Sequence, residues 1–218
     1  MKPLILINFK TYPEASGEQA VYLAKKIALV KSKRYELAVA PPELELEHVC
    51  KSVKIPVFAQ HVDAEQSGAH TGQITAAEVK RLGAQGTLLN HSERKLPFPV
   101  LKKTITKCKR EKLTVMVCAS TLAEVKRVAG LQPEYIAYEP KELIGGRVSV
   151  TSAKPEIIQK AVRMVKKISP TTKVLCGAGV HSRADLRKAL ELGAVGVLLS
   201  QAVVKAKDPK KMLEMMVG

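Results

Sequence analysis

Residues 173–199 read KVLCGAGVHSRADLRKALELGAVGVLL and contain one strand–helix–strand pattern. Short apolar runs at Lys173–Gly177 and Val195–Leu199 flank a polar segment. That segment has a helix start at Ser182-x-x-Asp185, a near relative of the capping box. The apolar runs are continuous rather than alternating, which is typical of parallel strands covered by helices. This stretch therefore predicts a β-α-β unit.

The same pattern recurs along the rest of the chain. Further short runs, several rich in β-branched residues, lie at Leu4–Asn8, Leu37–Ala40, Val57–Gln60, Thr87–Asn90, Thr114–Cys118 and Tyr135–Glu139. Eight β-α units in 218 residues leave about 27 residues per unit, close to the minimum for a strand, a helix and their connections. We therefore predict a single closed (β/α)8 barrel with residues 1–218 as one domain, in preference to an open doubly wound sheet.

Helix starts lie between the predicted strands. Thr75-x-x-Glu78 and Thr121-x-x-Glu124 match the capping box, and Asp208-Pro209 offers an N-cap followed by proline. After the fourth predicted strand, Pro97 and Pro99 stand where a helix should begin. We expect that helix to begin late or to be short, because proline restricts the backbone before it and lacks an N–H.

The composition excludes several classes of protein. Apolar runs fall far short of the ~20 residues that cross a bilayer, and the N-terminus lacks the pattern of a signal peptide. Because of that N-terminus we expect a cytoplasmic location. The cysteines form no C-x-x-C pair, so we expect reduced thiols and no metal site. The net charge of +16 raises the alternative of a nucleic-acid-binding module. We disfavour it, because basic doublets are interleaved with Glu and apolar residues and aromatic residues are few.

Polar residues follow the predicted strands at what would be the mouth of the barrel, where this fold places its chemistry. In chain order they are Asn8, Lys10, Gln60, Asn90, His91, Cys118, Glu139, Gly177–Gly179, Ser200 and Gln201. Each has an ordinary structural explanation alone. Together, a lysine, a histidine and a carboxylate supply a cation, an electrophile and a base, which fits proton abstraction next to a carbonyl group.

Six short segments stand out at or near the predicted strand ends: NFK at 8–10, AQHVD at 59–63, GAHTG at 68–72, NHSER at 90–94, AYEP at 137–140 and LIG at 143–145. These segments resemble those of one enzyme family, the triosephosphate isomerases, and in particular its short archaeal branch. The resemblance extends over the whole chain. It implies interconversion of dihydroxyacetone phosphate and glyceraldehyde 3-phosphate through an enediolate, in glycolysis and gluconeogenesis, with no cofactor and no metal.

The resemblance also implies roles for individual residues. Glu139 is expected to be the base, His91 the electrophile and Lys10 the cation facing the enediolate, with Asn8 keeping Lys10 and substrate in register. Main-chain amides are expected to bind the substrate phosphate, at Ile144, Gly145, Gly179, Ser200 and Gln201. Glu93 and Arg94 are expected to form structural ion pairs behind His91.

The family resemblance predicts self-association through residues 68–72, whose Thr71 would reach Lys10 and Asn8 of a second subunit. We favour a homodimer over a homotetramer, because Pro97 and Pro99 disturb the surface that tetramers use. The chain departs from the family pattern at Gly146-Arg147 and at Ser200-Gln201-Ala202. The alternative enzyme is another phosphate-binding barrel, such as an indole-ring or histidine-pathway enzyme, which would not need all of Lys10, His91 and Glu139.

Overall fold

Every predicted strand is present in the computed structural model, which describes residues 2–140 and 155–218. The strands are β1 (Leu4–Asn8), β2 (Glu36–Ala40), β3 (Phe58–Ala59), β4 (Gly86–Leu89), β5 (Thr114–Ala119), β6 (Tyr135–Tyr138), β7 (Lys173–Cys176) and β8 (Gly196–Leu199). They form one parallel sheet in the order β2-β1-β8-β7-β6-β5-β4-β3. An isolated bridge between Val39 and Val57 joins β2 to the segment before β3. The predicted barrel is confirmed as a nearly closed one.

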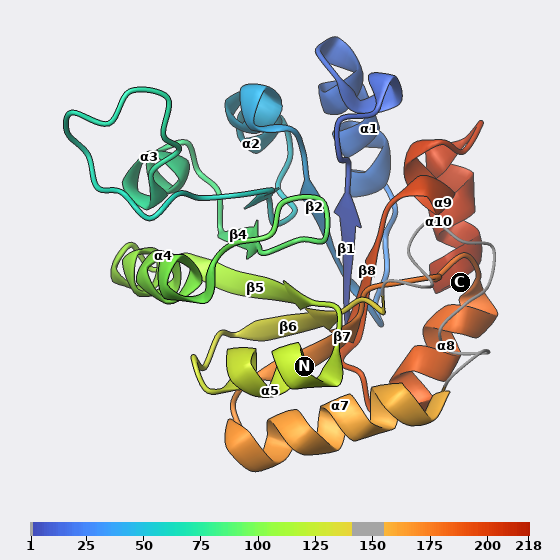
Figure 1. Cartoon of the computed structure of the whole chain (residues 1–218). Coiled ribbons are helices and arrows are strands. Elements are labelled where there is room, and N and C mark those ends of the chain that lie inside the picture. Colours follow the sequence, from blue (N-terminus) through green and yellow to red (C-terminus); the bar gives the residue numbers. More distant parts are fainter. Residues whose placement is uncertain (1, 141–154) are drawn as a thin grey trace.

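Helices surround the strands (Figure 1). They are α1 (Glu18–Ala28), α2 (Leu46–Ser52), α3 (Ala76–Arg81), α4 (Phe98–Arg110), α5 (Leu122–Ala129), α7 (Pro155–Ile168), α8 (Arg183–Glu191), α9 (Gln201–Val204) and α10 (Pro209–Val217), with short 3-10 turns at Pro13–Ala15 and Glu43–Glu45. The predicted N-caps are confirmed, since each side chain accepts a hydrogen bond from the amide three residues later: Thr75, Thr121, Ser182 and Asp208.

The helix after β4 differs in part from its prediction. It begins late, at Phe98, but it is not short, because α4 continues for 13 residues to Arg110. Pro97 is its N-cap and Pro99 lies in its first turn. The amides of a first turn have no acceptor within the helix, so proline costs little there. The prolines therefore fix where α4 begins without shortening it.

Side chains alternate between two hydrophobic layers, as expected for strands. Ile5 and Ile7 of β1 pack in the outer layer between sheet and helices. Leu4 and Leu6 belong to the layer that fills the barrel, together with Ala38, Ala40, Phe58, Leu88, Met116, Cys118, Ala137, Leu175 and Leu198. Continuing the alternation by one step directs Asn8 and Glu139 toward the barrel axis at its carboxyl end.

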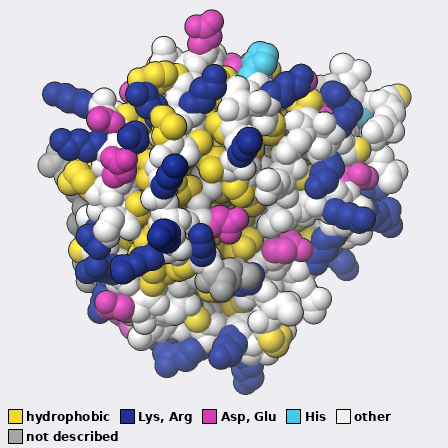
Figure 2. All heavy atoms as spheres, turned by 180° about the vertical axis from the view of Figure 1, so that it is seen from behind, with side chains coloured by type: hydrophobic (Ala, Val, Ile, Leu, Met, Phe, Trp, Pro, Cys, Tyr) yellow, Lys and Arg dark blue, Asp and Glu magenta, His cyan; other side chains and the backbone are white. Residues whose placement is uncertain are grey.

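The basic side chains are dispersed over the face of the molecule that Figure 2 shows. Figure 2 shows Lys and Arg spread over one face of the molecule, with acidic and hydrophobic side chains between them. This is the arrangement of solvated helix faces, not of a continuous basic stripe that tracks a nucleic-acid backbone. Among the described residues, no helix is long and apolar enough to cross a membrane.

Candidate active site

A pocket opens at the carboxyl ends of the strands, as predicted. Asn8, Lys10, His91 and Glu139 line it together with Gly177–His181 and Leu198–Ala202. The described structure thus brings together every residue to which the resemblance gave a role in catalysis or phosphate binding, except Ile144 and Gly145, which lie outside the described residues. Of the other polar residues expected at the mouth, Gln60, Asn90 and Cys118 do not line this pocket. Tyr12 and His181 are additional residues in or beside the pocket that sequence reasoning did not identify.

Glu139 directly follows β6 and is buried, with 2% of its surface exposed. Its Oε2 atom has no hydrogen-bond partner among the described residues. Burial raises the pKa of this carboxyl to about 8, although Lys10 and Lys95 act in the opposite direction. Such a carboxyl can both release and take up a proton near neutral pH.

Gly177 makes room for this carboxyl. β6 and β7 pair with Tyr138 beside Cys176, so the next residues, Glu139 and Gly177, lie side by side. A Cβ atom on Gly177 would lie 2.4 Å from Cγ of Glu139, well inside van der Waals contact. Any larger residue would therefore displace the Glu139 side chain.

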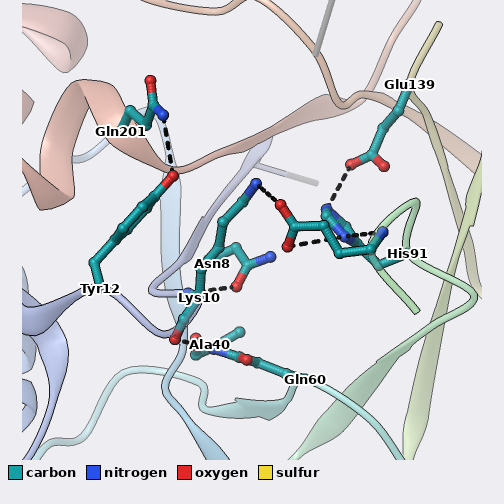
Figure 3. Close-up of polar contacts among 9 residues, drawn as sticks. Asn8, Lys10, Tyr12, Ala40, Gln60, His91, Glu139 and Gln201 are labelled. Atoms are coloured by element: carbon teal, nitrogen blue, oxygen red, sulfur yellow. Dashed lines mark hydrogen bonds and ion pairs between the residues drawn. The ribbon is translucent and has the colours of Figure 1, made fainter. Parts of the chain in front are cut away.

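His91 faces Glu139 across the pocket (Figure 3), with 3.7 Å between His91 Nε2 and Glu139 Oε1. The backbone amide of Glu93 donates a hydrogen bond to His91 Nδ1 at 3.2 Å. Because Nδ1 is an acceptor, the proton of a neutral ring resides on Nε2, the atom that faces the pocket. Burial lowers the pKa of His91 to about 4 and keeps the imidazole neutral, although the charge of Glu93 acts in the opposite direction; Lys10 and Lys95 add to the effect of burial.

Lys10 has a left-handed backbone, with φ of 51°. Its amide donates to Asn8 Oδ1 at 3.0 Å, and its carbonyl accepts from Gln60 Nε2 at 3.0 Å (Figure 3). Gln60 also donates to the carbonyl of Ala40 at 3.0 Å. A non-glycine residue in this region is strained, and three neighbouring strand ends maintain the strain here. Asn8 and Gln60 thus hold Lys10 at the pocket.

Glu93 corrects one expectation from the sequence. Arg94 does form a structural ion pair, with 3.7 Å between its Nη2 and Asp63 Oδ1. The Glu93 carboxylate instead pairs with Lys10, at 2.5 Å from Nζ, and lies 3.5 Å from His91 Nδ1. Glu93 is therefore adjacent to both residues and not behind His91. The direction of the Glu93 side chain could not be predicted from residue types, because it depends on the left-handed backbone of Asn90, three residues earlier.

The opposite side of the pocket consists mainly of backbone. Gly179 has a φ of 64°, which favours glycine, and Ser200 is the N-cap of α9. The amides at the start of a helix have no acceptor within it and can bind an anion. Gln201 turns its side chain away from this position, and its Nε2 donates to the Tyr12 hydroxyl at 3.0 Å (Figure 3).

Comparison with known proteins bears on this arrangement. The family model for triosephosphate isomerase matches residues 3–216. The chain belongs to the triosephosphate isomerase family. It is 43% identical to the triosephosphate isomerase of Methanothermus fervidus, over 98% of this chain and 96% of that protein. It is 44% identical to the triosephosphate isomerase of Methanocaldococcus jannaschii, over 94% of each chain. It is 42% identical to that of Archaeoglobus fulgidus, over 99% of this chain and 97% of that protein.

Membership in this family confirms the predicted activity. The protein is an isomerase that interconverts dihydroxyacetone phosphate and glyceraldehyde 3-phosphate, and its substrate is a phosphorylated triose. The similarity to archaeal members confirms the predicted branch. The alternatives of another phosphate-binding barrel and of a nucleic-acid-binding module are not supported.

Proposed function

We propose that Glu139 is the base of the isomerisation and that neutral His91 polarises the substrate carbonyl. The observation that carries this assignment is the pair itself: a buried carboxylate whose Oε1 lies 3.7 Å from His91 Nε2 and whose Oε2 has no hydrogen-bond partner among the described residues. One substrate can contact both groups at once, its carbon facing Glu139 and its adjacent carbonyl oxygen facing His91 Nε2. Removal of the carbon-bound proton by Glu139 then gives an enediolate. A proton passes from the hydroxyl oxygen to the former carbonyl oxygen, and return of the carbon-bound proton to the neighbouring carbon completes the reaction.

Lys10 is the cation that stabilises the negative charge of the enediolate. Its position is supported by two hydrogen bonds of its backbone, since its amide donates to Asn8 Oδ1 and its carbonyl accepts from Gln60 Nε2. The side chain of Lys10 is only 17% exposed, so its charge acts on the pocket with less screening than a surface lysine. Asn8 maintains the geometry of Lys10 relative to the substrate, as the resemblance implies.

Main-chain amides bind the phosphate at Gly179, Ser200 and Gln201, with Ile144 and Gly145 completing the site. The left-handed turn at Gly179 and the start of α9 at Gln201 support this proposal on the described side. An anion is well held by converging amides at a helix N-terminus. Gly179, Ser200 and Gln201 line the same pocket as His91 and Glu139, which supports one triose phosphate contacting both sets of residues at once.

The protein acts as a homodimer of single catalytic domains spanning residues 1–218, in the cytoplasm. Residues 66–73 are all exposed and form the loop that precedes α3 and extends from the barrel in Figure 1. Reciprocal hydrogen bonds between Asp63 and Ile74, both at 2.8 Å, fix the base of this loop. A fixed, protruding loop is suited to reach a second subunit.

Light scattering should give twice the chain mass, and an active monomer or a stable tetramer would contradict the dimer.

A coupled assay with glyceraldehyde 3-phosphate tests the proposed chemistry through His91→Asn. An amide can still donate one hydrogen bond to the carbonyl oxygen, so we expect a loss in kcat of about 10–100-fold, smaller than that for loss of the base. Unchanged circular dichroism is the control for folding. If a folded His91→Asn enzyme retains the parent kcat, the assignment of His91 as electrophile is wrong.

A further inference from the structure

The alternation of side chains breaks at the end of β4. Leu88 faces the barrel interior, so Asn90 would do so in a regular strand. Asn90 instead has a φ of 59°, and its side chain extends outward to α5, where Nδ2 lies 2.7 Å from Glu124 Oε1. This reversal is what allows the next residue, His91, to face the pocket. The orientation of His91 therefore depends on what holds Asn90.

Glu124 is the centre of the contacts that hold the end of β4 at Asn90. Its Oε1 accepts from Asn90, and its Oε2 accepts from the Ser120 amide at 2.7 Å, directly after β5. Lys95, in the segment between β4 and α4, binds both oxygens at 2.8 and 3.0 Å. One carboxylate on α5 thus joins the ends of two strands and the connection after His91.

The Asn90 side chain also makes hydrogen bonds to the backbone around it. Its Nδ2 also donates to the carbonyl of Cys118 at 2.9 Å, and its Oδ1 accepts from the Leu96 amide at 3.0 Å. Asn90 is 2% exposed, and loss of a partner for a buried amide is costly. The left-handed residue before His91 is therefore fixed on every side by strand, loop and helix.

We propose that Glu124 is a positioning residue for the isomerisation, which holds Asn90 and Lys95 so that His91 meets the substrate carbonyl. This inference rests on the proposed role of His91. Glu124 does not line the pocket and is not a catalytic residue. Its effect reaches the reaction through the backbone of Asn90 and through the charge of Lys95.

The charge of Lys95 provides a second route. Lys95 lowers the pKa of both His91 and Glu139. Burial has the largest influence on the pKa of each group, and the charge of Lys10, which acts in the same direction as Lys95, also exceeds the influence of Lys95. Glu93 acts in the opposite direction on both pKa values, more strongly than Lys95 at His91 and less strongly at Glu139. The Lys95 side chain is 34% exposed, so without Glu124 it can move into solvent. Loss of Glu124 should therefore raise the pKa of Glu139 further and move the rise of kcat/KM to higher pH.

The chain contains a matched control in Glu78. Glu78 occupies the same third position of α3 that Glu124 occupies in α5, and its amide is capped by Thr75 as that of Glu124 is by Thr121. The Glu78 carboxylate, however, pairs with Arg81 on the surface. Glu78→Ala thus removes the same helix-terminal charge without touching a strand end.

The experiment compares kcat, KM, pH profile and melting temperature of Glu124→Ala, Glu124→Gln and Glu78→Ala. A misplacement of about 1 Å can cost on the order of 100-fold, and we expect about tenfold in kcat for Glu124→Ala with KM little changed. Glu124→Gln keeps an acceptor oxygen and should recover part of that loss, yet show the same shift of pH profile. Glu78→Ala should keep the parent kcat and pH profile.

Two results would overturn the inference: a Glu124→Ala enzyme with the kcat and pH profile of Glu78→Ala, or a loss explained entirely by a fraction of unfolded protein. His91→Asn separates this inference from the proposed function. If His91→Asn keeps the parent kcat, the proposed role of His91 itself is wrong. If His91→Asn loses kcat while Glu124→Ala keeps the parent kcat and pH profile, only the positioning role of Glu124 is wrong.

Discussion

The two sides of the pocket are built from different parts of the chain. On one side, the side chains of Lys10, His91 and Glu139 line the pocket from the ends of β1, β4 and β6. On the other, after β7 and β8, backbone predominates, and Gln201 directs its side chain to Tyr12 instead. Chemistry that moves protons needs ionisable side chains, whereas an anion can be held by amides of almost any residue.

This difference explains how much each side tolerates substitution. The expected departure from the family pattern at Ser200-Gln201-Ala202 falls on the side where we propose that main-chain amides bind the phosphate. The other side contains Lys10, His91 and Glu139, whose side chains the proposed chemistry uses. On the β1-β4-β6 side, any change of these side chains should therefore cause a large loss of activity. On the β7-β8 side, only a substitution that changes the backbone should do so.

Glu139→Gln should show the largest effect. The amide keeps the size of the carboxylate but cannot accept a proton, and a positioned base contributes about 10²–10⁴-fold. We expect a loss of that order in kcat in the coupled assay, with unchanged circular dichroism. Glu93→Gln tests the neighbouring carboxylate, which pairs with Lys10, and should lose far less.

Lys10→Met should rank next. An enediolate in a water-poor pocket loses the full positive charge beside it, and removal of one such stabilising group costs about 10²–10³-fold. The methionine preserves most of the length of the side chain, and the backbone contacts to Asn8 and Gln60 remain. An enzyme with more than about a tenth of the parent kcat/KM would show that charge at this position is dispensable.

The backbone side is tested by a pair of substitutions. Gly179→Pro removes a donor and cannot adopt the φ of 64°, so KM should rise by about tenfold or more. Gln201→Ala removes only the hydrogen bond to Tyr12 and should raise KM by less than about fivefold. Equal, large losses for both would show that the phosphate is bound elsewhere.

The smallest effect concerns stability and not rate. The unfolded chain releases the proton of Glu139 near its ordinary pKa of 4.5, but the folded protein keeps it until about pH 8. The folded state therefore binds more protons between these values, and its stability falls as the pH rises through them. Glu139→Gln should melt at least about 2–4 °C above the parent at pH 8.5 and near it at pH 4.5, by scanning calorimetry. A constant difference across this range would contradict the raised pKa.

The sequence predicted the two sides of the pocket unequally. Continuous apolar runs located all eight strands, and alternation along each strand explains why Asn8 and Glu139 reach the mouth. The link between Glu93 and Lys10 could not be predicted, because it depends on left-handed backbones at Lys10 and Asn90 that residue types do not specify. The steric need for Gly177 required the register of β6 with β7. The phosphate-binding residues came only from resemblance, since amides have no signature in a sequence.

Exchange with heavy water tests the central assignment most directly, because it follows the first proton transfer alone. Dihydroxyacetone phosphate is incubated in D2O with parent enzyme or Glu139→Gln, and deuterium at the reacting carbon is followed by proton NMR. If Glu139 is the base, the parent should catalyse exchange and the folded variant should do so at less than about a hundredth of that rate. Exchange by Glu139→Gln at more than about a tenth of the parent rate would mean that another group removes the proton.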